Sequence, residues 1–130
     1  MDKNKLKILL VDDEPGFLEM MGNRIMSWGY DLLTAINGKD GIKSIKENKP
    51  DIVVLDYMMQ EMDGVETLKI IRKIDKNLPV IMFTAYPDKT SIKDTEKLGA
   101  HSYVPKLSPY SETHEALRAA INMAKKKRSK

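Results

Sequence analysis

The sequence predicts an α/β protein, a three-layer α/β/α sandwich in which two layers of helices cover a five-stranded parallel sheet. Two observations carry this prediction. Strand-like and helix-like patterns alternate five times along the chain. The strand-like runs are continuously apolar, which is typical of parallel strands that are covered on both faces. Consecutive strand–helix units with right-handed crossovers build a single sheet of this kind.

The first half of the chain contains three of the expected strands and two of the helices. The strands are expected at residues 5–11, 31–35 and 51–55, and the helices at 17–28 and 39–48. The first helix has an apolar face with spacings of three and four residues, formed by Phe17, Met21, Ile25 and Trp28. Pro15 and Gly16 mark its start, and Gly29 marks its end.

The second half contains the remaining two strands and three helices. Strands are expected at residues 80–84 and 102–104, and helices at 65–74, at 88–98 and from 110 to about 126. Leu68, Ile71 and Ile74 should face inward from the first of these helices. Ser108 and Pro109 predict the N-cap and first turn of the last helix.

Size and composition fit one domain of 130 residues, large enough to bury a core. The chain has no cysteine, which excludes disulfides and thiolate chemistry. No apolar signal segment precedes the first strand, and the apolar runs are too short to span a bilayer, so we expect a cytoplasmic protein without membrane contact. The net charge of +3 arises in the last six residues, which hold five of the 22 basic residues. Because no aromatic residues are interleaved there, we read this segment as a solvated helix end or linker and do not expect direct nucleic-acid binding.

Acidic residues follow two of the strands. Asp12 and Asp13 follow the first strand and Asp56 follows the third, while Thr84 ends the fourth. The carboxyl ends of parallel strands lie side by side, where open α/β sheets bind ligands. Clustered carboxylates repel each other and require a cation, and oxygen-only ligands favour Mg²⁺.

These residues, with Ala85, Tyr103, Lys106 and the loop from Asp56 to Gly64, resemble the receiver domain of bacterial two-component response regulators. The resemblance covers nearly the whole chain, which we divide into a receiver domain at 1–125 and a basic tail at 126–130. It implies the flavodoxin-like strand order 2-1-3-4-5.

The resemblance also implies a role for each residue of the motif. Asp56 is the expected phosphoacceptor, since a carboxylate can attack phosphorus to give an acyl phosphate. Asp12, Asp13, Asp56 and the Met58 carbonyl are the expected Mg²⁺ ligands. Lys106 and Thr84 would contact the phosphoryl group. Thr84 and Tyr103 would act as the switch that alters the surface of the fourth helix, fifth strand and fifth helix.

Partners follow from the same resemblance. The donor would be a sensor histidine kinase or a phosphotransfer protein, and the signal would pass to a downstream protein or an output domain. We expect no enzymatic activity beyond the domain's own phosphorylation and dephosphorylation. We expect a monomer or a weak, phosphorylation-dependent dimer. A stand-alone regulator and the receiver of a longer protein both fit, and Met1 favours the former.

Two positions depart from the family pattern. Leu107 follows Lys106 where the family usually has proline, and Gln60 stands where proline is common. Neither change removes a chemical group from the site, although both concern the shape of a loop.

Three other functions match these residues less well. A haloacid-dehalogenase-like phosphatase needs an aspartate two residues after the nucleophile, where this chain has Met58. A flavin-binding protein would need a phosphate loop after the first strand, where the carboxylates of Asp12 and Asp13 would repel phosphate. A phosphorylation-independent interaction domain on the same fold stays open.

Overall fold

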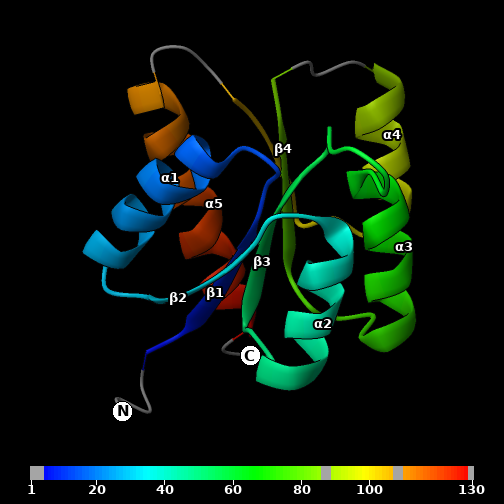
Figure 1. Cartoon of the computed structure of the whole chain (residues 1–130), viewed down its shortest axis with the longest axis horizontal. Helices are drawn as coiled ribbons and strands as arrows, with labels where there is room; N and C mark the ends of the chain where they lie inside the picture. The colour runs from blue at the N-terminus through cyan, green and yellow to red at the C-terminus, as the bar shows by residue number, and fades with distance from the viewer. Residues whose placement is uncertain (1–4, 86–88, 107–109, 129–130) are drawn as a thin grey trace.

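The computed structural model describes residues 5–85, 89–106 and 110–128, in which strands and helices alternate along the chain (Figure 1). The strands are β1 (Lys7–Val11), β2 (Asp31–Ala35), β3 (Ile52–Asp56), β4 (Val80–Thr84) and β5 (Ser102–Pro105). The helices are α1 (Pro15–Ser27), α2 (Gly38–Asn48), α3 (Gly64–Ile74), α4 (Lys89–Lys97) and α5 (Tyr110–Arg128).

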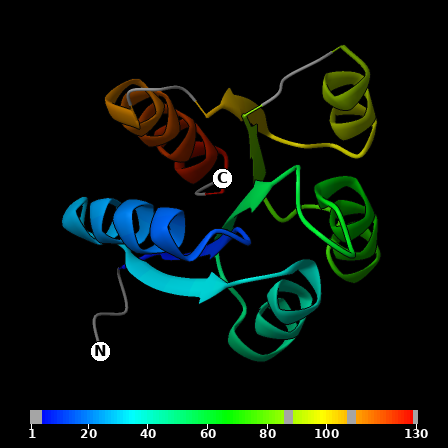
Figure 2. The same ribbon diagram turned by 45° about the horizontal axis from the view of Figure 1, so that its top comes forward.

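All neighbouring strands pair in parallel, in the order β2-β1-β3-β4-β5. The fold class and strand order predicted from the sequence are therefore confirmed. Helices α1 and α5 cover one face of the sheet, and α2, α3 and α4 cover the other (Figure 2). Because the strands are parallel, all five carboxyl ends lie along one edge, at the top of Figure 1.

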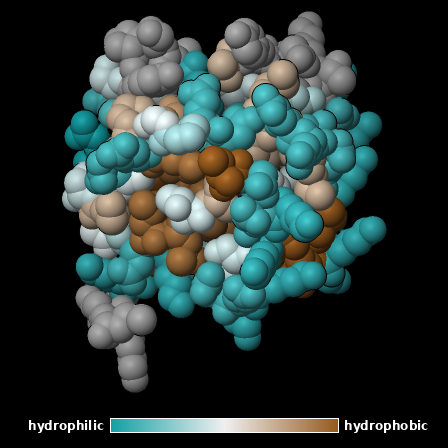
Figure 3. Space-filling view, viewed as in Figure 1, coloured by the Kyte–Doolittle hydropathy of each residue, from teal (hydrophilic) through white to brown (hydrophobic). Residues whose placement is uncertain are grey.

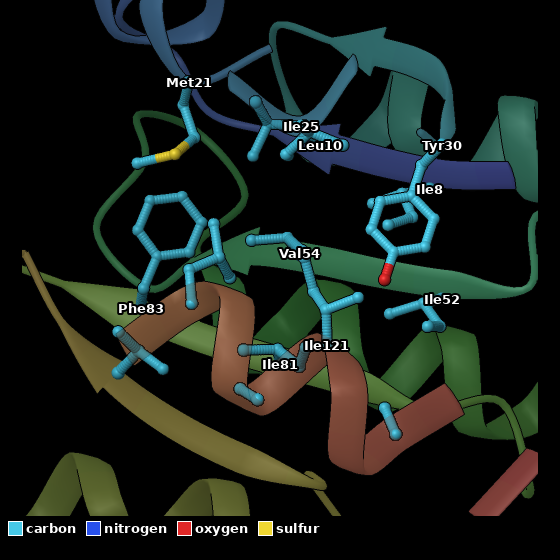
Figure 4. Packing of buried hydrophobic residues seen from close by; sticks show 14 of the residues in the cluster. Ile8, Leu10, Met21, Ile25, Tyr30, Ile52, Val54, Ile81, Phe83 and Ile121 are labelled. Carbon is cyan, nitrogen blue, oxygen red and sulfur yellow. The ribbon is translucent and has the colours of Figure 1, made fainter. Parts of the chain in front are cut away.

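The core is divided by the sheet into two clusters. Alternate residues of β1, β3 and β4 point to the α1/α5 side, where they pack with aromatic, aliphatic and alanine side chains of those helices (Figure 4). The intervening residues point to the other side and pack mainly against α2 and α3. Strands β3 and β4 are fully buried along their length, which explains their unbroken apolar sequences.

Several predicted details are corrected by the structure. Ile74 does not face inward but is 39% exposed, because it lies at the last turn of α3, beyond the buried Leu68 and Ile71. Trp28 is only partly buried and forms the C-cap of α1. Helix α5 continues to Arg128, so part of the expected tail is helical. Asp88 and the expected N-cap at Ser108 and Pro109 lie outside the described residues.

The face shown in Figure 3 is hydrophilic around its rim and apolar in an area over the edge strand β2. This strand is only partly covered, and its Leu32 and Leu33 are half-buried. Across the part of the chain that the structure describes, no helix combines the length and the hydrophobicity needed to cross a bilayer.

Candidate functional site

The acidic residues singled out in the sequence meet at the carboxyl edge of the sheet. Asp12 follows β1 directly and is fully buried, and Asp56 is the last residue of β3 with 3% of its surface exposed. Asp13 is half-buried beside them. One carboxylate oxygen of each residue lies within 4.8 Å of those of the other two. The three side chains therefore lie close together, as the sequence predicted.

Backbone N–H groups orient each carboxylate. Asp12 Oδ1 accepts a hydrogen bond of 2.9 Å from the N–H of Glu14. Asp56 Oδ1 accepts one of 3.3 Å from the N–H of Met58, whose side chain is exposed. Asp13 Oδ2 accepts one of 3.1 Å from the N–H of Gln60. The N-cap residue of α1 and the β3–α3 loop thus hold the three acids in place.

Lys106 lies among the acids from the end of β5. Its Nζ is 2.6 Å from Asp12 Oδ2 and 3.4 Å from Asp56 Oδ2, and only 8% of its side chain is exposed. Its backbone N–H donates to the carbonyl oxygen of Thr84 at 2.7 Å, which ties the residue to the end of β4. A lysine that the sequence could place only near the fifth strand is therefore fixed beside the predicted phosphoacceptor.

Two aromatic rings lie beneath the ammonium group. Nζ of Lys106 is 4.2 Å from the centroid of the Phe17 ring and 5.0 Å from that of Phe83. The two rings are themselves in contact, with their centroids 5.3 Å apart. Both distances to the ammonium fall within the range of cation–π interactions.

Burial and mutual repulsion perturb the ionisation of the site. Burial raises the pKa of Asp56 to about 7, and the negative charge of Asp12 adds to this effect. Burial likewise raises the pKa of Asp12, although Lys106 acts against it. Burial by itself would lower the pKa of Lys106, but the contacts with Asp12 and Asp56 outweigh it, so this pKa is raised. One lysine does not compensate two buried carboxylates, and the site favours a further positive charge.

The donor set fits a hard divalent cation. Three carboxylates supply only oxygen ligands, which suit Mg²⁺. Asp12 Oδ2 is buried, and the Lys106 ammonium lies 2.6 Å from it. An ionised carboxylate keeps further lone pairs, with which Asp12 could also reach a metal-bound water or the ion itself. The residues therefore could hold a metal at this edge.

The two expected switch residues lie on neighbouring strands and on the same face of the sheet. Thr84 is fully buried at the end of β4. Tyr103 of β5 pairs in register with Met82 of β4. It is half-buried and packs against the core cluster on the side of α2, α3 and α4. Because side chains alternate along a strand, Met82, Thr84 and Tyr103 share this face.

The β3–α3 loop contributes features that sequence patterns did not reveal. A Cβ on Gly64 would stand 2.6 Å from the Asp56 carbonyl oxygen, so α3 can begin this close to β3 only with glycine. Glu61 adopts a positive φ of 65°, in the region that glycine or asparagine prefers. The Asp63-Gly64 pair signalled the turn, whereas the Gln60 contact with Asp13 and the rings around Lys106 had no sequence signal.

Comparison with known proteins identifies the family. The family model described as "Response regulator receiver domain" matches residues 8–118. Sporulation initiation phosphotransferase F of Bacillus subtilis is 34% identical over 112 residues, which cover 86% of this chain and 90% of that protein. Transcriptional regulatory protein GlrR of Escherichia coli is 32% identical over 124 residues, which cover 95% of this chain but only 28% of that protein.

Solved structures agree with this assignment. The receiver domain of the Francisella response regulator 1452 superimposes with a TM-score of 0.83 at 29% identity and covers 95% of this chain and 98% of that one. The family model matches most of the chain, and one of the relatives has a similar length. The chain belongs to the family of response regulator receiver domains.

Proposed function

We propose that this receiver accepts a phosphoryl group on Asp56, with Mg²⁺, in a two-component phosphorelay. One observation carries the proposal. Asp56 lies at the end of β3 within 4.8 Å of the ligand oxygens of Asp12 and Asp13, and 3.4 Å from the ammonium of Lys106. A nucleophilic carboxylate, an oxygen-rich cation site and a basic residue thus share one edge of the sheet.

Each residue has a defined part in the reaction. Asp12, Asp13, Asp56 and the carbonyl of Met58 would hold Mg²⁺, which offsets the repulsion between the attacking carboxylate and the incoming phosphate. Lys106 would contact a phosphoryl oxygen, and the hydroxyl of Thr84 another. Phosphoryl transfer depends mainly on positioning and charge stabilisation, which these groups supply.

The step is a displacement at phosphorus. A carboxylate oxygen of Asp56 forms a bond to phosphorus while the bond from phosphorus to the imidazole nitrogen of a donor phosphohistidine breaks, and its electron pair returns to the imidazole. A separate hydrolysis step ends the signal: water attacks phosphorus, the bond to Asp56 breaks, and inorganic phosphate leaves. The protein would therefore act catalytically only on itself.

The donor and the output are part of the proposal. The donor would be a histidine kinase or a phosphotransfer protein of the cytoplasm. The relatives point to two forms of output, since one is named a phosphotransferase and another a transcriptional regulator. The chain spans only about a quarter of the latter's length, so the output could reside in a partner protein or in further sequence.

Switching would use the α2–α4 side of the sheet. The hydroxyl of Thr84 would move toward the phosphoryl group, and the ring of Tyr103 would rotate inward to fill the space. Tyr103 is half-buried, so its ring is not enclosed in the core as Thr84 is. The affected surface would comprise α4, β5 and α5, which is a two-state element biased by one local contact.

The test is the intact mass of the protein after incubation with acetyl phosphate and Mg²⁺. One added phosphoryl group is expected for the wild type, and none for Asp56→Asn or after chelation of the metal. Asp51→Asn is a matched control, because Asp51 is a half-buried aspartate that directly precedes β3, away from the site.

A second measurement separates the remaining alternatives. Beryllofluoride with Mg²⁺ mimics the phosphorylated state and should bind to the wild type. Failure of both acetyl phosphate and beryllofluoride would favour a phosphorylation-independent interaction domain on the same fold.

A further inference from the structure

Four side chains surround the ammonium of Lys106. The carboxylate oxygens of Asp12 and Asp56 lie 2.6 and 3.4 Å from it. The ring centroids of Phe17 and Phe83 lie 4.2 and 5.0 Å from it. The rings come from different layers, since Phe17 belongs to α1 and Phe83 to β4.

The rings themselves are rigidly held. Phe17 is 3% exposed and Phe83 is 2% exposed, and both belong to the core cluster on the α1/α5 side. Figure 4 shows the ring of Phe83 close to Met21 of α1. Two side chains fixed in a close-packed core present their faces at a constant position, and they can therefore define where a flexible neighbour lies.

Lysine needs such restraint to act as a positioned charge. Its side chain has four rotatable bonds, and ordering it costs rotamer entropy. A desolvated cation over an aromatic face recovers a comparable amount. The rings thus can offset the ordering cost before any phosphoryl group arrives.

We propose that Phe17 and Phe83 are positioning residues, an aromatic cage that holds the Lys106 ammonium beside Asp56 in readiness for the phosphoryl group. The proposal rests on the proposed phosphoacceptor function for its consequence, but not for its geometry. The cage acts through Lys106 alone, since the structure places the rings against its ammonium.

The cage offers a reason why this chain tolerates Leu107 after Lys106. The backbone of Lys106 is fixed to Thr84 by the hydrogen bond of 2.7 Å, and the tip of its side chain is fixed by the two rings. The backbone hydrogen bond and the ring contacts both join Lys106 to buried residues of the core, and neither contact requires a proline at the next position.

The first experiment detects the cage without any phosphoryl chemistry. Ring currents shift protons that lie over an aromatic face upfield, so the ε protons of Lys106 should resonate upfield of those of an exposed lysine such as Lys43 in a spectrum of the metal-free protein. The signal is assigned by its loss in Lys106→Arg. It should move toward the exposed position in Phe17→Leu and in Phe83→Leu. An Lys106 signal at the exposed position in the wild type would overturn the cage.

The second experiment is a double-mutant cycle read by calorimetry with beryllofluoride and Mg²⁺. Phe17→Leu should weaken beryllofluoride binding by about threefold to tenfold, the effect of losing one cation–π contact. In a Lys106→Met background the same substitution should have no further effect, because the group it positions is gone. Ile25→Leu is the matched control, since Ile25 lies on the same helix, is equally buried in the same cluster and should leave the affinity unchanged.

The outcomes distinguish the cage from the function on which it builds. An equal loss of affinity from Phe17→Leu in both backgrounds would show a general structural role and overturn the proposal. Wild-type protein with the upfield Lys106 signal but no beryllofluoride binding would support the cage and contradict the phosphoacceptor function instead. Unfolding measurements on each variant show that the comparison is made between folded proteins.

Discussion

The two faces of the sheet supply different parts of the candidate site. On the face covered by α1 and α5, Phe17 and Phe83 are almost fully buried and lie against Lys106. On the face covered by α2, α3 and α4, Thr84 is buried but its neighbour Tyr103 is only half-buried. The charged groups lie between the two, at the edge that both faces share.

The helices on the two faces are anchored differently. Helix α5 buries Leu117, Ala120, Ile121 and Ala124 against the sheet. Among the side chains of α4 that the structure describes, none that is apolar is fully buried, and the buried residue there is Thr95. Arg72 of α3 fixes the end of this segment by hydrogen bonds to the carbonyl oxygens of Leu98 and Gly99. The helices on one face are therefore packed tightly against the sheet, whereas α4 on the other face is held by fewer buried apolar contacts among its described side chains.

The largest expected effect contrasts one aromatic residue from each face. Phe83→Ala should lower the free energy of unfolding by about 3–5 kcal/mol, because it empties a packed core position. Tyr103→Ala should cost only about 1–2 kcal/mol, because its side chain is only partly buried. Chemical denaturation measures both. Equal losses would remove the distinction between a tightly packed and a loosely packed face.

The next effect concerns the acids that both faces share. Since the folded pKa of Asp56 is about 7 against an ordinary 3.8, the folded protein keeps a proton between those pH values that the unfolded chain has lost. The free energy of unfolding of the metal-free protein should therefore fall as the pH rises from about 4 to about 7, and level off above that.

Asp56→Asn isolates this contribution. The variant should be more stable than the metal-free wild type at pH 8, by an amount on the order of 2–4 kcal/mol, and equally stable at pH 4. Thermal or denaturant unfolding at the two pH values checks this. A variant less stable than the wild type at pH 8 would show that the carboxylate is not destabilised by its surroundings.

A smaller effect compares the starts of two helices. Gly64→Ala should cost about 1–3 kcal/mol, since the new Cβ would press on the backbone of Asp56 and Tyr57 where α3 approaches β3. Gly16→Ala is the control, because a Cβ there would meet nothing within 4 Å, and it should be neutral or stabilise the protein by up to about 1 kcal/mol. Similar effects for both would contradict the close approach of α3 to the phosphoacceptor strand.

The sequence was sufficient to predict the architecture and the convergence of three acidic residues at one edge of the sheet. Unbroken apolar strands and periodic helices are local signals, and they placed β2 and β4 at the bounds that the structure shows. Asp12, Asp13 and Asp56 could be brought together because parallel strands end at one edge. These inferences depend only on residue order and on the geometry of a parallel sheet.

Contacts between layers could not be predicted in the same way. The sequence assigned Phe17 to a buried helix face and Phe83 to a buried strand, but not their meeting beneath Lys106. The inward placement of Ile74 was wrong because the final turn of a helix can extend past the core that its earlier turns cover. Such details depend on side-chain directions and helix ends, which periodicity does not fix.

The most direct test of the account is the position of the phosphoryl group. Protein treated with acetyl phosphate and Mg²⁺ can be reduced with borohydride, which converts an aspartyl phosphate to homoserine, and the peptides can then be sequenced by mass spectrometry. The account predicts homoserine at position 56 and aspartate at positions 12 and 13. Homoserine at either of those two positions, or an unmodified Asp56 in protein that carries phosphate, would contradict it.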